Sequence, residues 1–458
     1  MNQTRRQFLR NAATASALLA TGCIGNQDPK TSYTSQIIKP RNRNTVFRWV
    51  DAALQQVRDQ RVTPPLAAYC LSLPLAAGFL AANGILQRYE EPFGVGPGPR
   101  GANAEVAYGV AFATAAAEAF QQPFLFERMA FLDRFPGSEA KDLGVRWGRT
   151  AARKVLDMRT NDGSEPSEAN HYLGRYERRT DSLRWRPTGP FYGAKPGPAF
   201  TSFDRPLHPG HGRIKPWTMK SGSQFRVPDF YDPKSPEFAE EFDRIRRIGG
   251  TNSAIRTADQ EQIALFWEDG PWGITPPGHM IYIAMQVLQD RGLSFIELAR
   301  ALALVGMTQC DASICAWDAK YHHDVLRPET AIRMRAPRFG NPDSRVVRQP
   351  GWSSFIPTPE FPAYPAGHST FGAAAAEMIA LIHGRGDVSF SGRSPDEVLW
   401  PQLRGVTRHW RSLSHMAEEN GMSRIFGGVH WELDHTAGMK AGLAIARQAF
   451  DSTFPKKA

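Results

Sequence analysis

Apolar residues at helical spacing recur along almost the whole chain, and this pattern constrains the fold more than any other feature. Within the patterned ranges apolar side chains return every three to four positions, Ala and Leu are abundant, and runs of β-branched residues are few. The sequence therefore predicts an all-α protein. The ranges in the first part of the chain are Thr45 to Gln60, Pro65 to Tyr89, Ala104 to Phe135 and Ser138 to Met158.

A change of composition divides these helices into two groups. Residues 45–160 predict an N-terminal helical bundle, and residues 236–458 predict a C-terminal one. Residues 161–235 are rich in Gly, Pro, Arg and aromatic residues, which is typical of a long irregular connection. In the second bundle we expect helices over Pro236 to Ile248, Thr257 to Trp267, Pro277 to Asp290, Ser294 to Leu326, from Gly367 onward, Leu403 to Asn420 and Val429 to Phe450.

Residues 1–23 resemble a twin-arginine export signal. The pair Arg5 and Arg6 stands ahead of Phe-Leu and a weakly apolar run, and this run is too short to span a membrane. Cys23 ends a stretch that also resembles a bacterial lipobox, with Ala20 where Leu is usual. The protein is therefore expected to be exported, and to be periplasmic, secreted or anchored on the outer side of the membrane through Cys23. Residues 24–44 read as a polar linker.

The overall charge is compatible with anionic small molecules as ligands. The formal net charge is +10, part of which lies in the export signal, and the sequence contains no recognisable nucleic-acid-binding module, so we expect no nucleic-acid partner. Beyond Cys23 the chain has only Cys70, Cys310 and Cys315, too few for a disulfide framework. They are expected to be buried apolar residues.

The stretch FPAYPAGHSTFG, residues 361–372, predicts an anion site. An extended segment fixed by prolines ends at Pro365, and a helical pattern begins at Gly367. The first amides of a helix have no partner within it, so those of Gly367 and His368 are expected to face an anion. His368 would then stand at the edge of this site.

Two flanking stretches supply cations. Lys320 and Arg327 are seven residues apart, which places them on nearly the same face of one helix, although a solvated charge pair would show the same spacing. Farther on, Gly427-Gly428 separates Arg424 from His430 and allows a tight turn.

Asp434 follows His430 at the i+4 position. Its carboxylate can accept the proton of one ring nitrogen and leave the other free as a nucleophile or a metal ligand. The alternative, in which His430 is an ordinary helix-surface residue, accounts less well for the nearby Arg424 and Asp434.

Together these stretches resemble the three-part signature of the vanadium-dependent haloperoxidases and type 2 phosphatidic acid phosphatases. The resemblance covers the chain from about Thr257 to its end and implies a vanadate cofactor, with hydrogen peroxide and halide, or a phosphate ester, as substrates. The residues that carry it are Lys320, Arg327 and Pro328, then Pro365, Gly367 and His368, then Ser423, Arg424, His430 and Asp434.

The resemblance also implies roles for these residues. Lys320, Arg327, Gly367 and Arg424 would bind the oxyanion, and His430, oriented by Asp434, would be the ligand to vanadium. His368 would be the acid–base group, and Lys320 would polarise bound peroxide.

Two aromatic residues favour the peroxidase branch. Trp317 and Phe361 match positions that flank the halide site in chloroperoxidase-type enzymes, where bromoperoxidases tend to have His in place of Phe361. We expect the two rings to form opposite apolar walls of a halide pocket. One departure from the family pattern is Ala366, where Ser is usual.

Two other functions use the same residues. In an exported acid phosphatase, His430 would attack phosphorus to form a phosphohistidine while His368 protonates the leaving alcohol. A non-catalytic phosphate-binding protein would need only the cations and amides to hold phosphate. The presence of His368, His430 and Asp434 together therefore argues against that interpretation.

Overall fold

The computed structural model describes residues 44–164, 176, 179, 181–186, 206–270, 273–397 and 399–457. The predicted export signal, Cys23 and the linker up to residue 43 lie outside the described residues. In the described part helices dominate, and two three-residue strands form the one small sheet. The prediction of an all-α protein is confirmed.

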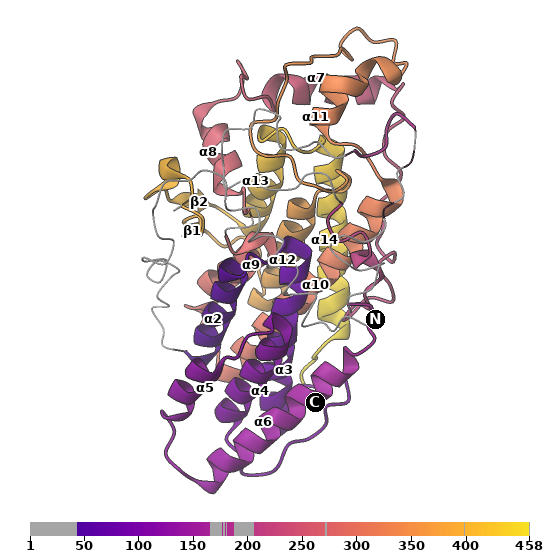
Figure 1. Ribbon diagram of the computed structural model, residues 1–458. Helices are drawn as coiled ribbons and strands as arrows, with labels where there is room; N and C mark the ends of the chain where they lie inside the picture. The colour runs from indigo at the N-terminus through magenta and orange to yellow at the C-terminus, as the bar shows by residue number, and fades with distance from the viewer. Residues whose placement is uncertain are drawn as a thin grey trace.

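The first group of helices lies together at one end of the molecule (Figure 1). Within it, α3 packs on α4, and α6 packs across both. The predicted helix from Ala104 to Phe135 is wrong: α4 ends at Phe120, Gln121 adopts a left-handed φ of 52°, and α5 follows. The helices are α2 (Thr45–Asp59), α3 (Pro64–Leu86), α4 (Ala104–Phe120), α5 (Leu125–Leu132) and α6 (Glu139–Met158).

Helix α3 is long and apolar enough to cross a membrane by length and composition, but nearly all of it is buried inside the protein. At Gly78 an added Cβ would stand 2.8 Å from the ring of Tyr108. This close approach of α3 and α4 is consistent with a core helix.

The second group surrounds α12 (Gly367–His383), and α14 (Glu432–Ser452) and α13 (Leu413–Phe426) pack directly against it. The predicted helix over Leu403 to Asn420 is wrong in its first half. η5 (Pro401–Leu403) ends where that stretch begins, and a strand at Arg408–Trp410 follows before α13 starts at Leu413. The remaining helices are α7 (Pro236–Ile248), α8 (Ala258–Phe266), α9 (Thr275–Leu288), α10 (Phe295–His323), α11 (Pro328–Thr330), η3 (Ala331–Arg335) and η4 (Ala336–Arg338).

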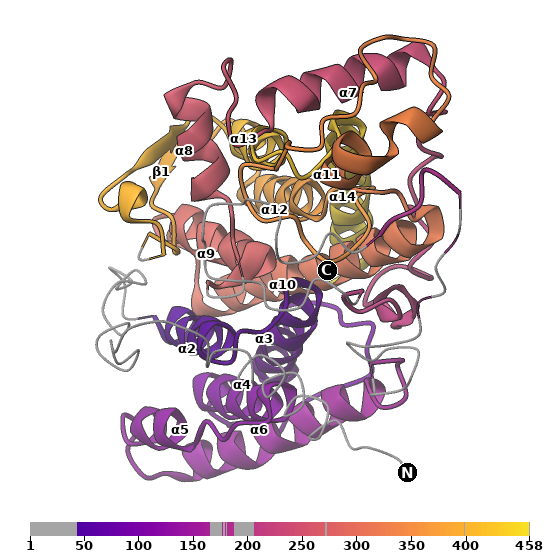
Figure 2. The same ribbon diagram turned by 45° about the horizontal axis from the view of Figure 1, so that its top comes forward.

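Helix α10 joins the two groups. It packs against α3 on one side and against α12 and α14 on the other, and Figure 2 shows it running between them. The buried apolar residues of both groups form one hydrophobic cluster. Helix α10 ends at His323, and the side chains of its C-terminal turn lie near the start of α12.

The described parts of residues 161–235 contain one short helix, η2 (His211–Arg213), and otherwise irregular chain, as predicted for most of the connection. The two strands, β1 (Phe390–Gly392) and β2 (Arg408–Trp410), form an antiparallel hairpin beside α8 (Figure 1).

Candidate active site

The N-terminus of α12 is the centre of the site. Gly367 is the first helical residue, and Ala366 at the N-cap offers no side-chain hydrogen bond to the free amides. A Cβ added at Gly367 would meet nothing closer than 3.7 Å, at the rings of Phe371 and Trp317. The protein therefore leaves the first amides of α12 open to a ligand.

Lys320 lies in the last turn of α10 and is fully buried. Its ammonium donates to the backbone carbonyls of Pro362, Ala363 and Pro365 at 3.0, 2.9 and 2.5 Å. An ammonium has three donors, so all of them serve the segment that leads into α12. Lys320 thus holds this segment in place, a role that the sequence did not predict.

Removing this ammonium is expected to destabilise the protein. Lys320→Met leaves three buried carbonyls without a donor, and although it also removes a buried charge we expect the free energy of unfolding to fall by about 2 kcal/mol. Urea denaturation without added oxyanion measures this change. Lys440→Met, an exposed position on α14, is the control. Equal transition midpoints for the two variants would show that the ammonium does not hold the segment.

Arg327 connects three parts of the site. Its Nε donates to the carbonyl of Phe361 at 2.8 Å, and its Nη1 donates to the carbonyl of Val429 at 2.7 Å. The same Nη1 lies 2.9 Å from Nε2 of His430. A guanidinium can only donate, so Nε2 of His430 must be the unprotonated nitrogen.

The other nitrogen of His430 is oriented by Asp434. His430 Nδ1 lies 2.7 Å from Oδ2 of Asp434, which also accepts the amide of Trp431 at 3.0 Å. His430 stands before the first residue of α14, not inside the helix as predicted, and Asp434 reaches back to it from the first turn. The imidazole therefore presents an unprotonated Nε2 to the site, and its one proton lies on Nδ1, facing Asp434.

The turn between Arg424 and His430 depends on glycine. Gly428 has φ of 74°, and a Cβ there would lie 2.1 Å from the carbonyl oxygen of Gly249. The predicted tight turn is present. Arg424, in the last turn of α13 just before it, donates from Nη1 to the carbonyl of Trp267 at 3.0 Å.

His368 faces a carboxylate that sequence reasoning missed. Its Nε2 lies 4.0 Å from Oδ2 of Asp269, while Oδ1 of Asp269 is 2.9 Å from Nδ1 of His279. Asp269 adopts a left-handed φ of 49° between α8 and α9. The adjacent acidic and Gly-Pro residues in WEDGP were a weak sign of such a turn. This carboxylate can orient His368 or stabilise its protonated form.

Burial shapes the electrostatics of the site. It lowers the pKa of Arg327 to about 9 and that of Arg424 to about 10, and it holds the pKa of Lys320 well below its ordinary value. Burial, with Arg327 next, also keeps the pKa of His430 well below its ordinary range, and burial raises the pKa of Asp434 to about 7. Cations confined this way favour an anion between them.

Two guanidinium donors of the site, Nη2 of Arg327 and Nε of Arg424, lack a hydrogen-bond partner among the described residues, as do Nε2 of His368, whose role depends on the tautomer, and the acceptors Oδ2 of Asp269 and Oδ1 of Asp434. Buried donors are normally paired, so the two guanidinium nitrogens mark a place for an acceptor-rich ligand. Together with the open amides of α12, these donors fit a tetrahedral oxyanion such as vanadate or phosphate.

Trp317 and Phe361 lie beside the cations, but not as two opposite walls. Their ring centroids are only 5.0 Å apart, so the rings contact one another and form one apolar surface. The expectation of opposite walls is wrong because Trp317 is pinned by a hydrogen bond from Nε1 to the carbonyl of Leu207. Lys320 Nζ lies 5.0 Å from the centroid of Phe361, and Cζ of Arg327 lies 4.8 Å from it.

The predicted site residues thus cluster where the C-terminal ends of α10 and α13 meet the N-terminal ends of α12 and α14. All three donors of Lys320 already serve the protein itself, whereas Arg327 and Arg424 each keep an unpartnered nitrogen. The residues are Trp317, Lys320, Arg327, Phe361, Gly367, His368, Arg424, His430 and Asp434.

Comparisons with known proteins agree with this architecture. Residues 300–455 match a family model described as the VCPO second helical-bundle domain. A vanadium chloroperoxidase from Curvularia inaequalis is 29% identical over an aligned length of 251 residues, covering 44% of this chain and 41% of that protein. The matched region therefore spans less than half of that relative.

Among solved structures, a bacterial vanadium-dependent iodoperoxidase has a TM-score of 0.70 and 22% identity, covering 90% of this chain and 97% of the other. A bacterial vanadium-dependent chloroperoxidase in its apo form has a TM-score of 0.65 and 19% identity, with 85% and 95% covered. The fold likeness thus extends well beyond the three motifs, into the N-terminal helices.

The fold is that of the helical-bundle haloperoxidases. The likeness in sequence to vanadium chloroperoxidase is established for the second helical bundle, residues 300–455, and the likeness in fold to the vanadium haloperoxidases for most of the chain.

Proposed function

We propose that this protein is a vanadium-dependent haloperoxidase, which oxidises halide with hydrogen peroxide to hypohalous acid. The observation that carries the proposal is the bare Nε2 of His430 beside buried, unpartnered donors of Arg327 and Arg424. Similarity to vanadium chloroperoxidase and to the fold of bacterial haloperoxidases favours this branch.

Vanadate would be held by Arg327, Arg424 and the amide of Gly367, with His430 Nε2 as the protein ligand. When bound, it would supply Lewis acidity toward peroxide without a change in its oxidation state. As a ligand, Nε2 would no longer accept the hydrogen bond from Nη1 of Arg327. Arg327 then keeps its bonds to Phe361 and Val429 and stays in position.

The remaining side chains move protons and exclude water. Burial, and then Arg424, holds the pKa of His368 well below its ordinary value, so this imidazole is neutral and can accept a proton from peroxide. Asp269 faces it and would stabilise the imidazolium that results. Lys320 would reach the oxyanion by exchanging one of its three carbonyl acceptors.

A phosphatase is the second candidate. The same Nε2, oriented by Asp434 through Nδ1, suits attack on phosphorus, and phosphate has the same tetrahedral shape as vanadate. A phosphate-binding protein without catalysis is less well supported, because binding alone does not need the oriented His430 or the Asp269–His368 pair.

One purified sample, divided in two, tests the choice. Half is assayed for bromide oxidation with vanadate and peroxide, and half for phosphate-ester hydrolysis without vanadate. The proposal requires vanadate-dependent oxidation and little hydrolysis. Hydrolysis without oxidation would establish the phosphatase, and neither activity with tight phosphate binding would establish the binding protein.

Phe361 is expected to affect halide choice. In Phe361→His an imidazole replaces an apolar ring that lies next to Lys320 and Arg327, so a polar, protonatable group enters the halide surface. We expect chloride turnover to fall about threefold more than bromide turnover, a difference of roughly 0.7 kcal/mol in activation free energy. Both rates are measured at acidic pH and at equal vanadate saturation. An unchanged rate ratio would place Phe361 outside the halide site.

Export by the twin-arginine route is a further part of the proposal, with the protein periplasmic, anchored at Cys23 or secreted. Replacing Arg5 and Arg6 together by Lys should retain the protein in the cytoplasm, because that pathway reads the arginine pair itself and not cationic charge in general. Cell fractionation measures the result, and normal export would indicate another route. Cys23→Ala separates anchored from soluble protein, since only an anchored protein changes its fraction.

A further inference from the structure

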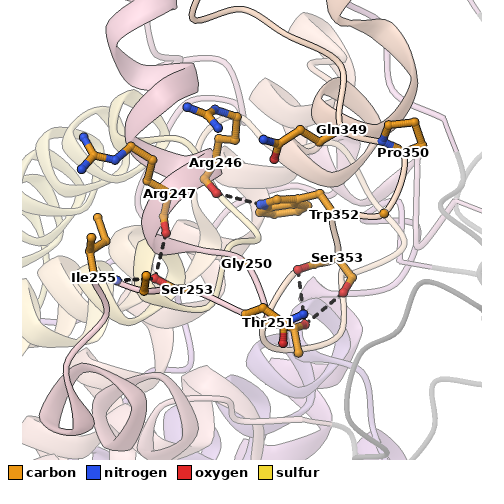
Figure 3. Close-up of a pocket in the computed structure, with 13 residues that line it drawn as sticks. Arg246, Arg247, Gly250, Thr251, Ser253, Ile255, Gln349, Pro350, Trp352 and Ser353 are labelled. Atoms are coloured by element: carbon orange, nitrogen blue, oxygen red, sulfur yellow. Dashed lines mark hydrogen bonds between the residues drawn. The ribbon is translucent and has the colours of Figure 1, made fainter.

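A second cavity lies apart from the residues of the oxyanion site. It has a volume of about 590 Å³ and is formed by the last turn of α7 and by two loops, residues 250–255 and 349–353 (Figure 3). No oxyanion-site residue described above lines it. This volume is in the range of cavities that hold small organic molecules.

One wall of this cavity is apolar and held in place. The indole of Trp352 lies at the centre of the view in Figure 3, and its Nε1 donates to the carbonyl of Arg246 at 2.8 Å. A Cβ added at Gly250 would stand 2.8 Å from this nitrogen, so the backbone approaches the ring closely. Ile255, which Figure 3 shows on the other side of the cavity near Arg247, exposes 47% of its surface and is one of few large apolar residues to do so among the described residues. Trp352 is only 8% exposed, so the part of its ring that reaches the cavity is small but fixed, and together with the free aliphatic side chain of Ile255 it suits a flat apolar ligand.

The other wall is cationic. Arg246 and Arg247 share a single carboxylate, Asp243: Arg246 forms a close ion pair with it, and Arg247 Nη1 lies 3.8 Å from it. The Nε of Arg246 is buried without a hydrogen-bond partner among the described residues. No acidic residue is present among the described residues that line the cavity. Two guanidiniums with one acid between them leave positive charge for a ligand anion.

We propose that this cavity binds a small aromatic molecule that carries one anionic group, such as an aryl carboxylate. The ring packs on Trp352 and Ile255, and the carboxylate pairs with Arg247 at the edge, where 56% of the Arg247 side chain is exposed to solvent. This site goes beyond the proposed peroxidase function and does not depend on it.

The cavity and the oxyanion site have no side chain in common, but backbone hydrogen bonds connect the segments that form them. The amide of Phe355, two residues after the cavity wall ends, donates to the carbonyls of both Gly249 and Gly427 at 3.0 Å. Gly427 belongs to the turn that leads to His430. Aromatic ligand and oxyanion can therefore be bound together, and phosphate is not expected to displace the aromatic ligand.

Titration calorimetry with 2-naphthoate and with uncharged 2-naphthamide tests the proposal on the purified protein. We expect saturable binding of naphthoate, and at least about fivefold weaker binding of the amide. Arg247→Gln should weaken naphthoate binding about fivefold and leave the amide unaffected, whereas Ile255→Asn should weaken both. Arg244→Gln is the matched control, because Arg244 lies on the same helix but pairs with Glu432.

Three results would overturn the site. They are no saturable binding of naphthoate, equal effects of Arg247→Gln and Arg244→Gln, and displacement of naphthoate by inorganic phosphate, which would assign it to the oxyanion site. Thermal unfolding of each variant shows whether it is folded, and both tested positions are exposed enough to tolerate substitution. A haloperoxidase assay plays no part in these results, so failure of the proposed function leaves them unchanged.

Discussion

His430→Ala is expected to abolish binding of vanadate at the site and any phosphoenzyme formation. Nε2 of His430 is the ring nitrogen that contacts Arg327, and Asp434 holds this imidazole in position through Nδ1. Loss of the only protein ligand should weaken affinity for vanadate by at least about a hundredfold. Vanadium content after dialysis against orthovanadate measures this effect.

His409→Ala is the control for this experiment. His409 is exposed on β2 and is not among the residues of the oxyanion site, so its replacement removes an imidazole without altering that site. Its vanadium content should equal that of the wild type. An unchanged vanadium content in His430→Ala would contradict the assignment of His430 as the ligand.

His368→Ala is expected to separate binding from turnover. His368 makes no hydrogen bond to Arg327, His430 or Asp434, so the oxyanion cradle should remain and vanadate affinity should change by less than about threefold. Turnover should fall by about 10²–10⁴, the contribution of a positioned acid–base group. Vanadium content and the rate of halide oxidation are measured on the same sample.

The pH profile gives a second measure of this role. The rate of halide oxidation by the wild type, plotted against pH, should show a transition that reports proton transfer at His368. This transition should be absent from the pH profile of the residual activity of His368→Ala. If His368→Ala instead lost vanadate as fully as His430→Ala, His368 would have to be reassigned as a binding residue.

Local sequence patterns predicted most of the site because its parts are local. The helix start at Gly367 follows from a proline-fixed segment and a helical run, and the Gly427-Gly428 turn follows from backbone conformation that favours glycine. The i+4 pairing of His430 with Asp434 needs only one turn of chain. The shared fold of the family then accounts for how the three stretches meet.

Contacts between distant segments could not be predicted. Lys320 meets the Pro362–Pro365 carbonyls across more than forty residues, and Asp269 meets His368 across about a hundred. Trp317 was placed on the wrong side of the halide surface because its anchor is the carbonyl of Leu207, in a loop with no periodic pattern. Such pairings depend on how helices pack.

The errors in helix boundaries did have local signals. Pro123 follows the left-handed Gln121 that ends α4, and it was sufficient to break the predicted helix. Ser412 caps α13 through a hydrogen bond from the amide of His415, which marks the true start of that helix. We nevertheless predicted continuous helices, because apolar residues recur at helical spacing across both stretches.

The central claim is that the buried cations, the α12 amides and His430 form one vanadate site. Equilibrium dialysis of wild-type protein against orthovanadate, followed by metal analysis, tests it most directly. The account predicts one vanadium per chain, displaced by excess phosphate, with the rate of bromide oxidation proportional to the vanadium retained. Absence of saturable vanadium binding, or bound vanadium that phosphate does not displace and that supports no oxidation, would contradict it.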